Sequence, residues 1–209
     1  MRRWRFVVVT ALTLVAATGC DPVAEPAGPT TSPAGTGSAD HPTPAGVAQA
    51  ARSQVVPEAP RLLALPDGTV MPVDPADSGA DGVLDIPKDV NRAGWWTGGS
   101  RLGDPFGSIV LAAHVDSLSQ GVGPIVGLLS ARPGDRVTAT GVRLSQRFRV
   151  RSVRLVERAS LHQRSAVFSP RGAPRLVLIT CAGPYDPARG GYRDNLVVTA
   201  VPDGRLLRR

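Results

Sequence analysis

One cysteine, one histidine and one arginine carry the side chains that can together perform acyl transfer. Cys181 follows the apolar run 176–179 and a threonine, His114 follows the apolar run 109–113, and Arg193 opens a third run. A thiol that attacks a carbonyl needs a proton-transfer partner and a donor for the oxyanion that forms. A guanidinium keeps its charge and presents several donors in a fixed fork. Because all three stand at the ends of expected strands, we expect them to meet at one rim of a sheet.

Each of these residues also has an ordinary structural interpretation. Cys181 can be a buried core thiol, His114 a structural histidine and Arg193 one more surface arginine. The second cysteine, Cys20, lies in the leader described below, so Cys181 lacks a disulfide partner, and exported proteins usually avoid an unpaired thiol unless it is used. Asp116 either orients the imidazole of His114 or forms a turn. Cys181 has no neighbouring Cys or His at zinc spacing, so we expect neither a metal nor an organic cofactor.

Short apolar stretches punctuated by Gly, Pro and Asp must position these residues. They continue from residue 61 onward without a long helical period, which is typical of an all-β domain. We expect strands at 69–73, 83–86, 108–113, 136–140, 146–156, 175–180 and 196–201, and a helical turn at 124–130. We expect Trp95 and Trp96 to pack in the core rather than to line a binding groove. A closed β-barrel of about eight strands, with one or two short helical turns, leaves no exposed sheet edge and is the predicted fold.

The N-terminal sixty residues divide into a leader and a tether. Residues 1–20, MRRWRFVVVTALTLVAATGC, have a basic start, an apolar run and small residues before Cys20, which is an export signal. The last four residues resemble a bacterial lipobox, which implies lipid attachment at Cys20; an uncleaved membrane anchor and plain secretion are the alternatives. Residues 21–60 are rich in Pro, Ala, Gly, Thr and Ser and predict a flexible tether. All three outcomes place the domain at 61–209 outside the cytoplasm.

The net charge of +7 does not indicate a nucleic-acid-binding protein. Three arginines lie in the leader, at positions 2, 3 and 5. The segment from Arg143 to Arg175 contains nine arginines and a single acidic residue, Glu157. Nucleic-acid binding does not fit an exported domain that lacks stacking aromatic side chains beside these arginines. We interpret this stretch as a solvated strand face, with docking to an anionic wall polymer or lipid headgroups as the alternative.

Several motifs make the chain resemble the sortases, specifically the actinobacterial class F group. The motifs are VLDIPKDVNRAGWW, GSIVLAAHVDS followed by GLLSARPGD, LVLITCAGPYD and GGYRDNLVV, between about Val83 and Val201. The order His, Cys, Arg also differs from papain-like and NlpC-like enzymes, in which the cysteine precedes the histidine.

The resemblance implies a cell-surface cysteine transpeptidase. Cys181 would cleave an LPxTG-like sorting signal of exported proteins after its threonine and form a thioester. An amine of a peptidoglycan precursor or a pilin-type lysine would then resolve the thioester. His114 would be the acid and base, Arg193 would stabilise the oxyanion, and Thr180 would help to position the substrate. The loop at 158–174 would lie over the sorting-signal groove. Two alternatives stay open: a sortase-like hydrolase, and an inactive, lipid-anchored wall-binding module.

Overall fold

A computed structural model describes residues 55–209, except residues 81 and 164–165. The predicted leader with Cys20, and most of the predicted tether, lie outside the described residues, so these assignments and the domain boundary at residue 61 stay predictions. Within the described chain, Glu58 already forms a bridge with Leu102.

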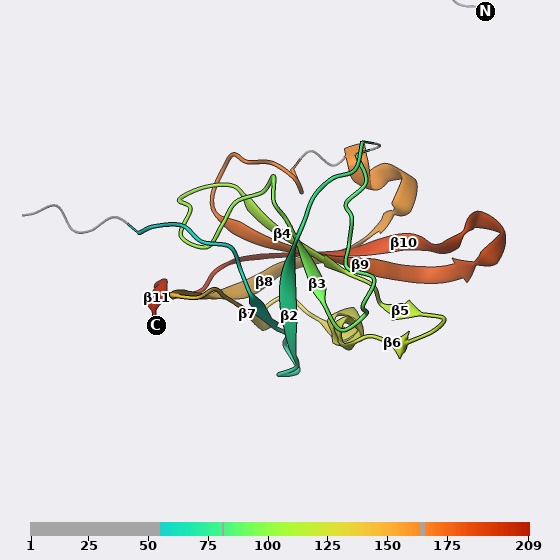
Figure 1. Ribbon diagram of the computed structural model, residues 1–209, viewed down its shortest axis with the longest axis horizontal. Helices are drawn as coiled ribbons and strands as arrows, with labels where there is room; N and C mark the ends of the chain where they lie inside the picture. Colours follow the sequence, from blue (N-terminus) through green and yellow to red (C-terminus); the bar gives the residue numbers. More distant parts are fainter. Residues whose placement is uncertain (1–54, 81, 164–165) are drawn as a thin grey trace, which may run out of the picture. The chain divides into compact units, whose positions relative to one another are not determined.

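Eight strands close into a barrel (Figure 1). They follow the order β10-β9-β4-β3-β2-β1-β7-β8, and the pairing of β10 with β8 closes the ring. The predicted all-β barrel of about eight strands is therefore confirmed. The barrel strands are β1 (Leu62–Ala64), β2 (Val70–Ala76), β3 (Ala93–Trp96), β4 (Ser108–Ala113), β7 (Arg136–Thr140), β8 (Leu144–Glu157), β9 (Arg175–Asp186) and β10 (Gly191–Pro202).

Among the described residues, three short strands and three 3₁₀ segments lie outside the eight-stranded barrel. A two-residue strand, β11 (Leu207–Arg208), pairs with the start of β8, and β5 (Asp116–Ser117) forms a separate hairpin with β6 (Gly121–Val122). Three 3₁₀ segments are η1 (Pro124–Ser130), η2 (Arg158–Gln163) and η3 (Pro187–Arg189), the first at the predicted position. No helix in the described part of the chain has the length and apolar character needed to cross a membrane.

The sheet buries both of its faces in one region. Residues of β4 are buried throughout, because alternate side chains contribute to two separate clusters. The inner core fills the barrel and includes Leu111, Leu178 and Val198. We call the second group the outer cluster; it consists of Val110, Ala112, Val156, Val177, Ile179 and Val197, and Leu161, Val167 and Phe168 pack against it.

Several boundaries differ from the predicted ones. β9 and β10 continue well past the apolar runs, so that Cys181 and Arg193 lie inside a long hairpin and not at strand ends. Mutual backbone pairing extends both strands into polar sequence that has no strand signal of its own. The expected strand at 83–86 is wrong, because only Leu84 forms an isolated bridge, with Ser78. β3, which contains both neighbouring tryptophans, was not predicted as a strand.

The barrel carries its own core. Residues 50–209 form one compact unit, and every member of the inner core lies between Leu63 and Ala200. Hydrophobic burial is the main favourable term in folding, so this unit contains what it needs to fold by itself.

Candidate active site

Parallel pairing of β4 with β9 brings His114 next to Cys181. The register matches each residue of β4 with one of β9, up to Ala113 opposite Thr180. His114 directly follows Ala113, and Cys181 directly follows Thr180. Each side chain is half-buried, and Cys181 is a free cysteine. The strand pairing therefore places a thiol beside an imidazole-bearing segment at the end of β4.

Antiparallel pairing of β9 with β10 brings Arg193 to the same region. Asn195 lies opposite Cys181, and Arg193 is two residues before Asn195 on the same strand. The register shifts between Tyr192 and Asp194, so Gly183 and Pro184 form a β-bulge on β9 opposite the single residue Arg193. The Arg193 side chain is exposed.

Strand alternation places all three residues on the outer face of the sheet. Cys181 continues the alternation of Val177 and Ile179, which belong to the outer cluster, and it also contacts the inner core. His114 continues the alternation of Val110 and Ala112, and Arg193 continues that of Val197 and Asn195. The candidate site thus lies next to the buried outer cluster, at the end of β4.

Two charges act on the thiol besides burial. Burial raises the pKa of Cys181 above its ordinary value, the Arg158 guanidinium lowers it, and the Asp116 carboxylate raises it. Arg158 begins η2 directly after β8, and its Nη1 donates a hydrogen bond to the Gly190 carbonyl at 3.3 Å. Sequence reasoning missed Arg158, because only the pairing of β8 with β10 brings it to this region.

Asp116 has a partner that the sequence did not indicate. The Tyr192 hydroxyl donates a hydrogen bond to Asp116, and this bond, with burial and the carboxylate charge, raises the pKa of Tyr192 to about 12. The ring of Tyr192 also packs edge-on against Tyr185, with centroids 5.2 Å apart. Asp116 thus connects the segment after His114 to the strand that carries Arg193.

Thr180 and the two tryptophans have structural contacts. The Thr180 hydroxyl is buried and donates to the Ala113 carbonyl at 2.9 Å, which ties the residue before Cys181 to the residue before His114. Trp95 is buried in the inner core and donates to the Ser100 carbonyl at 3.1 Å. Trp96 packs edge-on against Phe168, at a centroid distance of 5.6 Å, beside the outer cluster.

Among the residues that the structure describes, no three His, Cys, Asp or Glu side chains gather in a group that would hold an ion.

The family model for sortase domains matches residues 72–203, more than half of the chain. The chain therefore belongs to the sortase family. No curated protein matches.

Solved structures of similar fold are also sortases. Sortase A of Listeria monocytogenes is 15% identical with a TM-score of 0.52, and the match covers 73% of this chain and 92% of that one. The SrtA sortase of Actinomyces oris is 19% identical with a TM-score of 0.54, covering 75% and 86%. Sortase E1 of Streptomyces coelicolor, solved with a tripeptide in its active site, is 15% identical with a TM-score of 0.53, covering 73% and 91%. At these identities the likeness shows the fold alone.

Proposed function

We propose that this sortase-family protein is a cysteine transpeptidase that acts on exported proteins with an LPxTG-like sorting signal. The observation that carries the proposal is the register of three neighbouring strands. It sets His114 beside Cys181 through Ala113 and Thr180, and Arg193 near Cys181 through Asn195. Parallel and antiparallel neighbours lie about 4.8 Å apart, within reach of side chains that share a face.

The chemistry follows from these three groups. The Cys181 thiolate attacks the carbonyl carbon after the threonine of the signal, and an S–C bond forms while the oxyanion accepts hydrogen bonds from Arg193. Collapse of this intermediate breaks the C–N bond, and His114 protonates the leaving amine. An incoming amine then attacks the thioester and gives its proton to His114, and the C–S bond breaks to release the Cys181 thiolate, which restores the starting thiolate–imidazolium pair. We assign Thr180 an indirect effect on the substrate, because its hydroxyl holds the two strands that carry His114 and Cys181.

The raised pKa of Cys181 has a consequence for this reaction. A thiol that is mostly protonated at neutral pH reacts only in the fraction of molecules in which it is ionised. The imidazole must carry a proton in the same molecules, so two coupled groups determine the active fraction.

The location and partners belong to the same proposal. We propose an extracytoplasmic domain held at the membrane through its N-terminus, by lipid at Cys20 or by an uncleaved anchor. The resolving amine would come from a peptidoglycan precursor or a pilin-type lysine. The class F assignment is also a proposal, since the comparisons match sortases of other classes.

Mass spectrometry of residues 50–209 with an LPxTG peptide and an amine nucleophile tests the activity. We expect a ligated product, and a thioester at Cys181 when the nucleophile is withheld. Cys181→Ala should give neither. Arg193→Lys keeps the charge but loses the fork and should lower kcat about a hundredfold or more. Cleavage without ligation would support the hydrolase instead, and a folded domain that forms no thioester would contradict the mechanism.

A further inference from the structure

Basic and apolar side chains gather at the end of the barrel where the described chain begins. A Cβ at Gly103 would lie only 2.7 Å from Val55 Cγ1, so Val55 packs against this loop. Glu58 pairs with Leu102 and accepts hydrogen bonds from the backbone N–H groups of Arg143 and Leu144, both at 2.7 Å. We call this region the Val55 end; it comprises residues 55–58, 101–106, 141–145 and 204–209.

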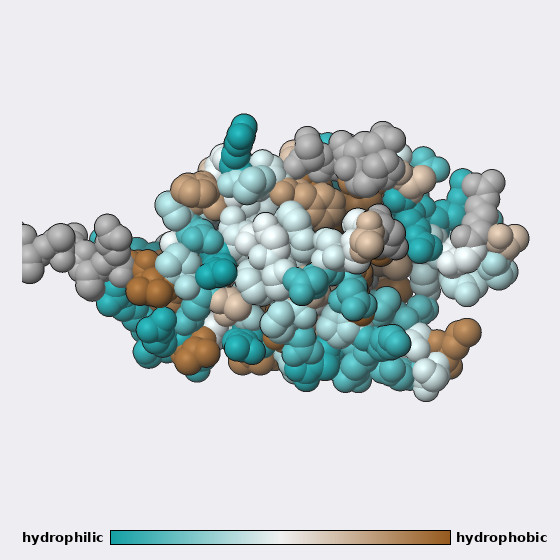
Figure 2. Space-filling view, turned by 45° about the horizontal axis from the view of Figure 1, so that its top comes forward, coloured by the Kyte–Doolittle hydropathy of each residue, from teal (hydrophilic) through white to brown (hydrophobic). Residues whose placement is uncertain are grey.

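Four large apolar side chains of the Val55 end are more than half exposed. They are Val56 at 62%, Phe106 at 58%, Val142 at 71% and Leu207 at 56%. Leu207 pairs with Ser145 at the start of β8, next to the turn that holds Val142. Figure 2 shows brown side chains beside the point where the described chain begins, with teal ones around them. Single exposed apolar residues are ordinary, but several at one end indicate an interaction surface.

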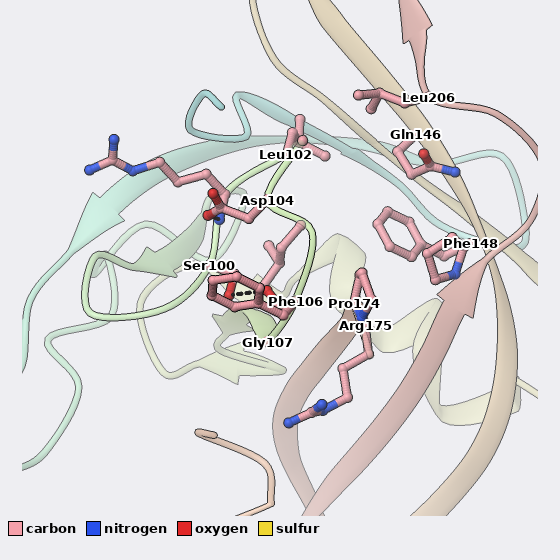
Figure 3. Close-up of a pocket in the computed structure, with 14 residues that line it drawn as sticks. Ser100, Leu102, Asp104, Phe106, Gly107, Gln146, Phe148, Pro174, Arg175 and Leu206 are labelled. Atoms are coloured by element: carbon pink, nitrogen blue, oxygen red, sulfur yellow. Dashed lines mark hydrogen bonds between the residues drawn. The ribbon is translucent and has the colours of Figure 1, made fainter. Parts of the chain in front are cut away.

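A small apolar cavity opens at the same end. Its volume is about 180 Å³, and Leu102, Phe106, Phe148 and Leu206 lie around it (Figure 3). Ile109 and Arg175 also line it, near the starts of β4 and β9. His114 and Cys181 follow the opposite ends of the buried parts of these strands, about 17–20 Å away at 3.3 Å per residue.

The charged groups of the Val55 end are mostly cationic. Its exposed arginines are Arg101, Arg143, Arg205, Arg208 and Arg209. Three carboxylates lie close by, and each has donors. Glu58 accepts from the β7–β8 turn and also pairs with the Arg143 guanidinium at 3.4 Å, Asp104 accepts from the Arg101 N–H at 2.7 Å, and Asp203 binds Arg136 and Arg149 from neighbouring strands. Five arginines outnumber the two carboxylates of the Val55 end, Glu58 and Asp104, so its side chains carry a positive net charge that complements an anionic partner.

We propose that the Val55 end docks on the anionic phospholipid surface of the membrane. Its arginines would lie against lipid phosphates, and its exposed apolar side chains would insert among the headgroups. An anionic bilayer matches both properties, and the chain that leads toward the predicted anchor leaves from this end. Figure 1 shows β11 and the start of the described chain at one end and the β9–β10 hairpin extending toward the other, so docking would point the reactive end away from the bilayer. The inference rests on the proposed membrane location and not on transpeptidation.

Co-sedimentation of residues 50–209 with vesicles tests the docking. We expect binding to vesicles that contain phosphatidylglycerol, little binding to phosphatidylcholine alone, and weaker binding as salt rises. Replacing Arg205, Arg208 and Arg209 by glutamine should lower the membrane binding constant about a hundredfold, since each arginine near an anionic surface raises that constant about fivefold. The matched control changes three exposed arginines elsewhere, Arg132, Arg151 and Arg154, to glutamine and should change binding less than about twofold.

Apolar insertion has its own pair of variants. Val142→Ser combined with Leu207→Ser should weaken vesicle binding about fivefold or more, whereas Leu118→Ser, on the exposed β5–β6 hairpin, should not. Cys181→Ala should bind as the unmodified domain does, which separates this test from the test of catalysis. No binding to anionic vesicles at low salt, an equal loss in the arginine control, or equal affinity for soluble polyphosphate would overturn the proposal.

Discussion

The ionisation of Cys181 depends on two charged side chains of opposite sign. Arg158 stabilises the thiolate and Asp116 destabilises it, while burial favours the neutral thiol. The sequence does not single out Arg158, and it indicates Asp116 only as a residue that orients His114 or forms a turn. The reactivity of the thiol is therefore a property of its surroundings as much as of the residue itself.

Substitution of these two charges should move the pH profile of thiol alkylation in opposite directions. The profile of the unmodified domain should have an apparent pKa above that of a free cysteine. Arg158→Gln should raise this pKa and slow iodoacetamide labelling of Cys181 at neutral pH about two- to tenfold, and Asp116→Asn should lower the pKa and speed labelling. Arg154→Gln, at an exposed position on β8, is the control. A profile unchanged by Arg158→Gln would show that its charge does not reach the thiol.

The β9–β10 hairpin determines where Arg193 stands. Its bulge sets Arg193 opposite Gly183, which has a φ of 79°. A Cβ at Gly183 would lie 2.4 Å from Asp194 Oδ2, so this position needs glycine for both conformation and space. The bulge therefore depends on a residue that has no side chain of its own.

Alanine at Gly183 should damage both stability and activity. We expect a loss of about 1–3 kcal/mol in the free energy of unfolding, measured in urea, and a lower kcat, because a shifted bulge moves Arg193. Gly190→Ala is the matched control: Gly190 has a φ of 75°, but its Cβ would meet nothing within 4 Å. It should cost stability through conformation alone and leave kcat close to that of the unmodified domain. Equal effects on kcat would contradict the assigned role of the bulge.

Glu58 stabilises the β7–β8 turn from outside the strand ladder. Although burial would raise its pKa, hydrogen bonds from the backbone N–H groups of Arg143 and Leu144 lower the pKa below its ordinary value. A depressed carboxyl pKa contributes stability above the unfolded value of about 4.5 and loses it as the pH falls through the folded value.

Glutamine at position 58 should therefore destabilise the barrel in a pH-dependent way. The expected loss is about 1–3 kcal/mol at pH 7, because charged hydrogen bonds to two backbone donors are weakened. The difference from the unmodified domain should shrink in urea titrations below pH 4. Glu157→Gln, an exposed change of the same chemistry, should show little effect at either pH. A difference that persists undiminished in acid would mean that the carboxylate charge is not responsible.

At the scale of the whole molecule, the two faces of the sheet pack into two separate apolar clusters. The inner core closes the barrel, and the buried outer cluster lies next to His114 and Cys181. Leu178 and Ile179 are neighbours on β9 that face opposite ways. Both side chains are buried, so mutating these adjacent residues tests whether the proposed substrate binding depends on one face of the sheet and not on the other.

Adjacent alanine substitutions should differ in their effect on substrate binding. Leu178→Ala removes a fully buried inner-core side chain and should cost about 2–5 kcal/mol of unfolding free energy, with the KM of the folded enzyme nearly unchanged. Ile179→Ala also removes a buried side chain and should likewise cost stability, but it should in addition raise the KM for the sorting peptide, because Ile179 precedes Cys181 by two residues and shares its face of the sheet. Denaturant titration and peptide kinetics measure the two effects. The same KM for both variants would argue against a peptide beside the outer cluster.

The sequence by itself determined the class of fold, and it singled out His114, Cys181 and Arg193, whose catalytic roles are part of the proposed function. The short apolar runs at 108–113 and 175–180 and the alternating pattern at 136–140 indicate local burial, which can be recognised without knowing the pairing partners, and strands were found at all three. Only the tertiary structure decided the extent of β9 and β10, the bulge opposite Arg193 and the approach of Arg158 and Tyr192. These features come from pairing between segments far apart in the chain. Backbone hydrogen bonds and charges act across space, so no local pattern of residues encodes them.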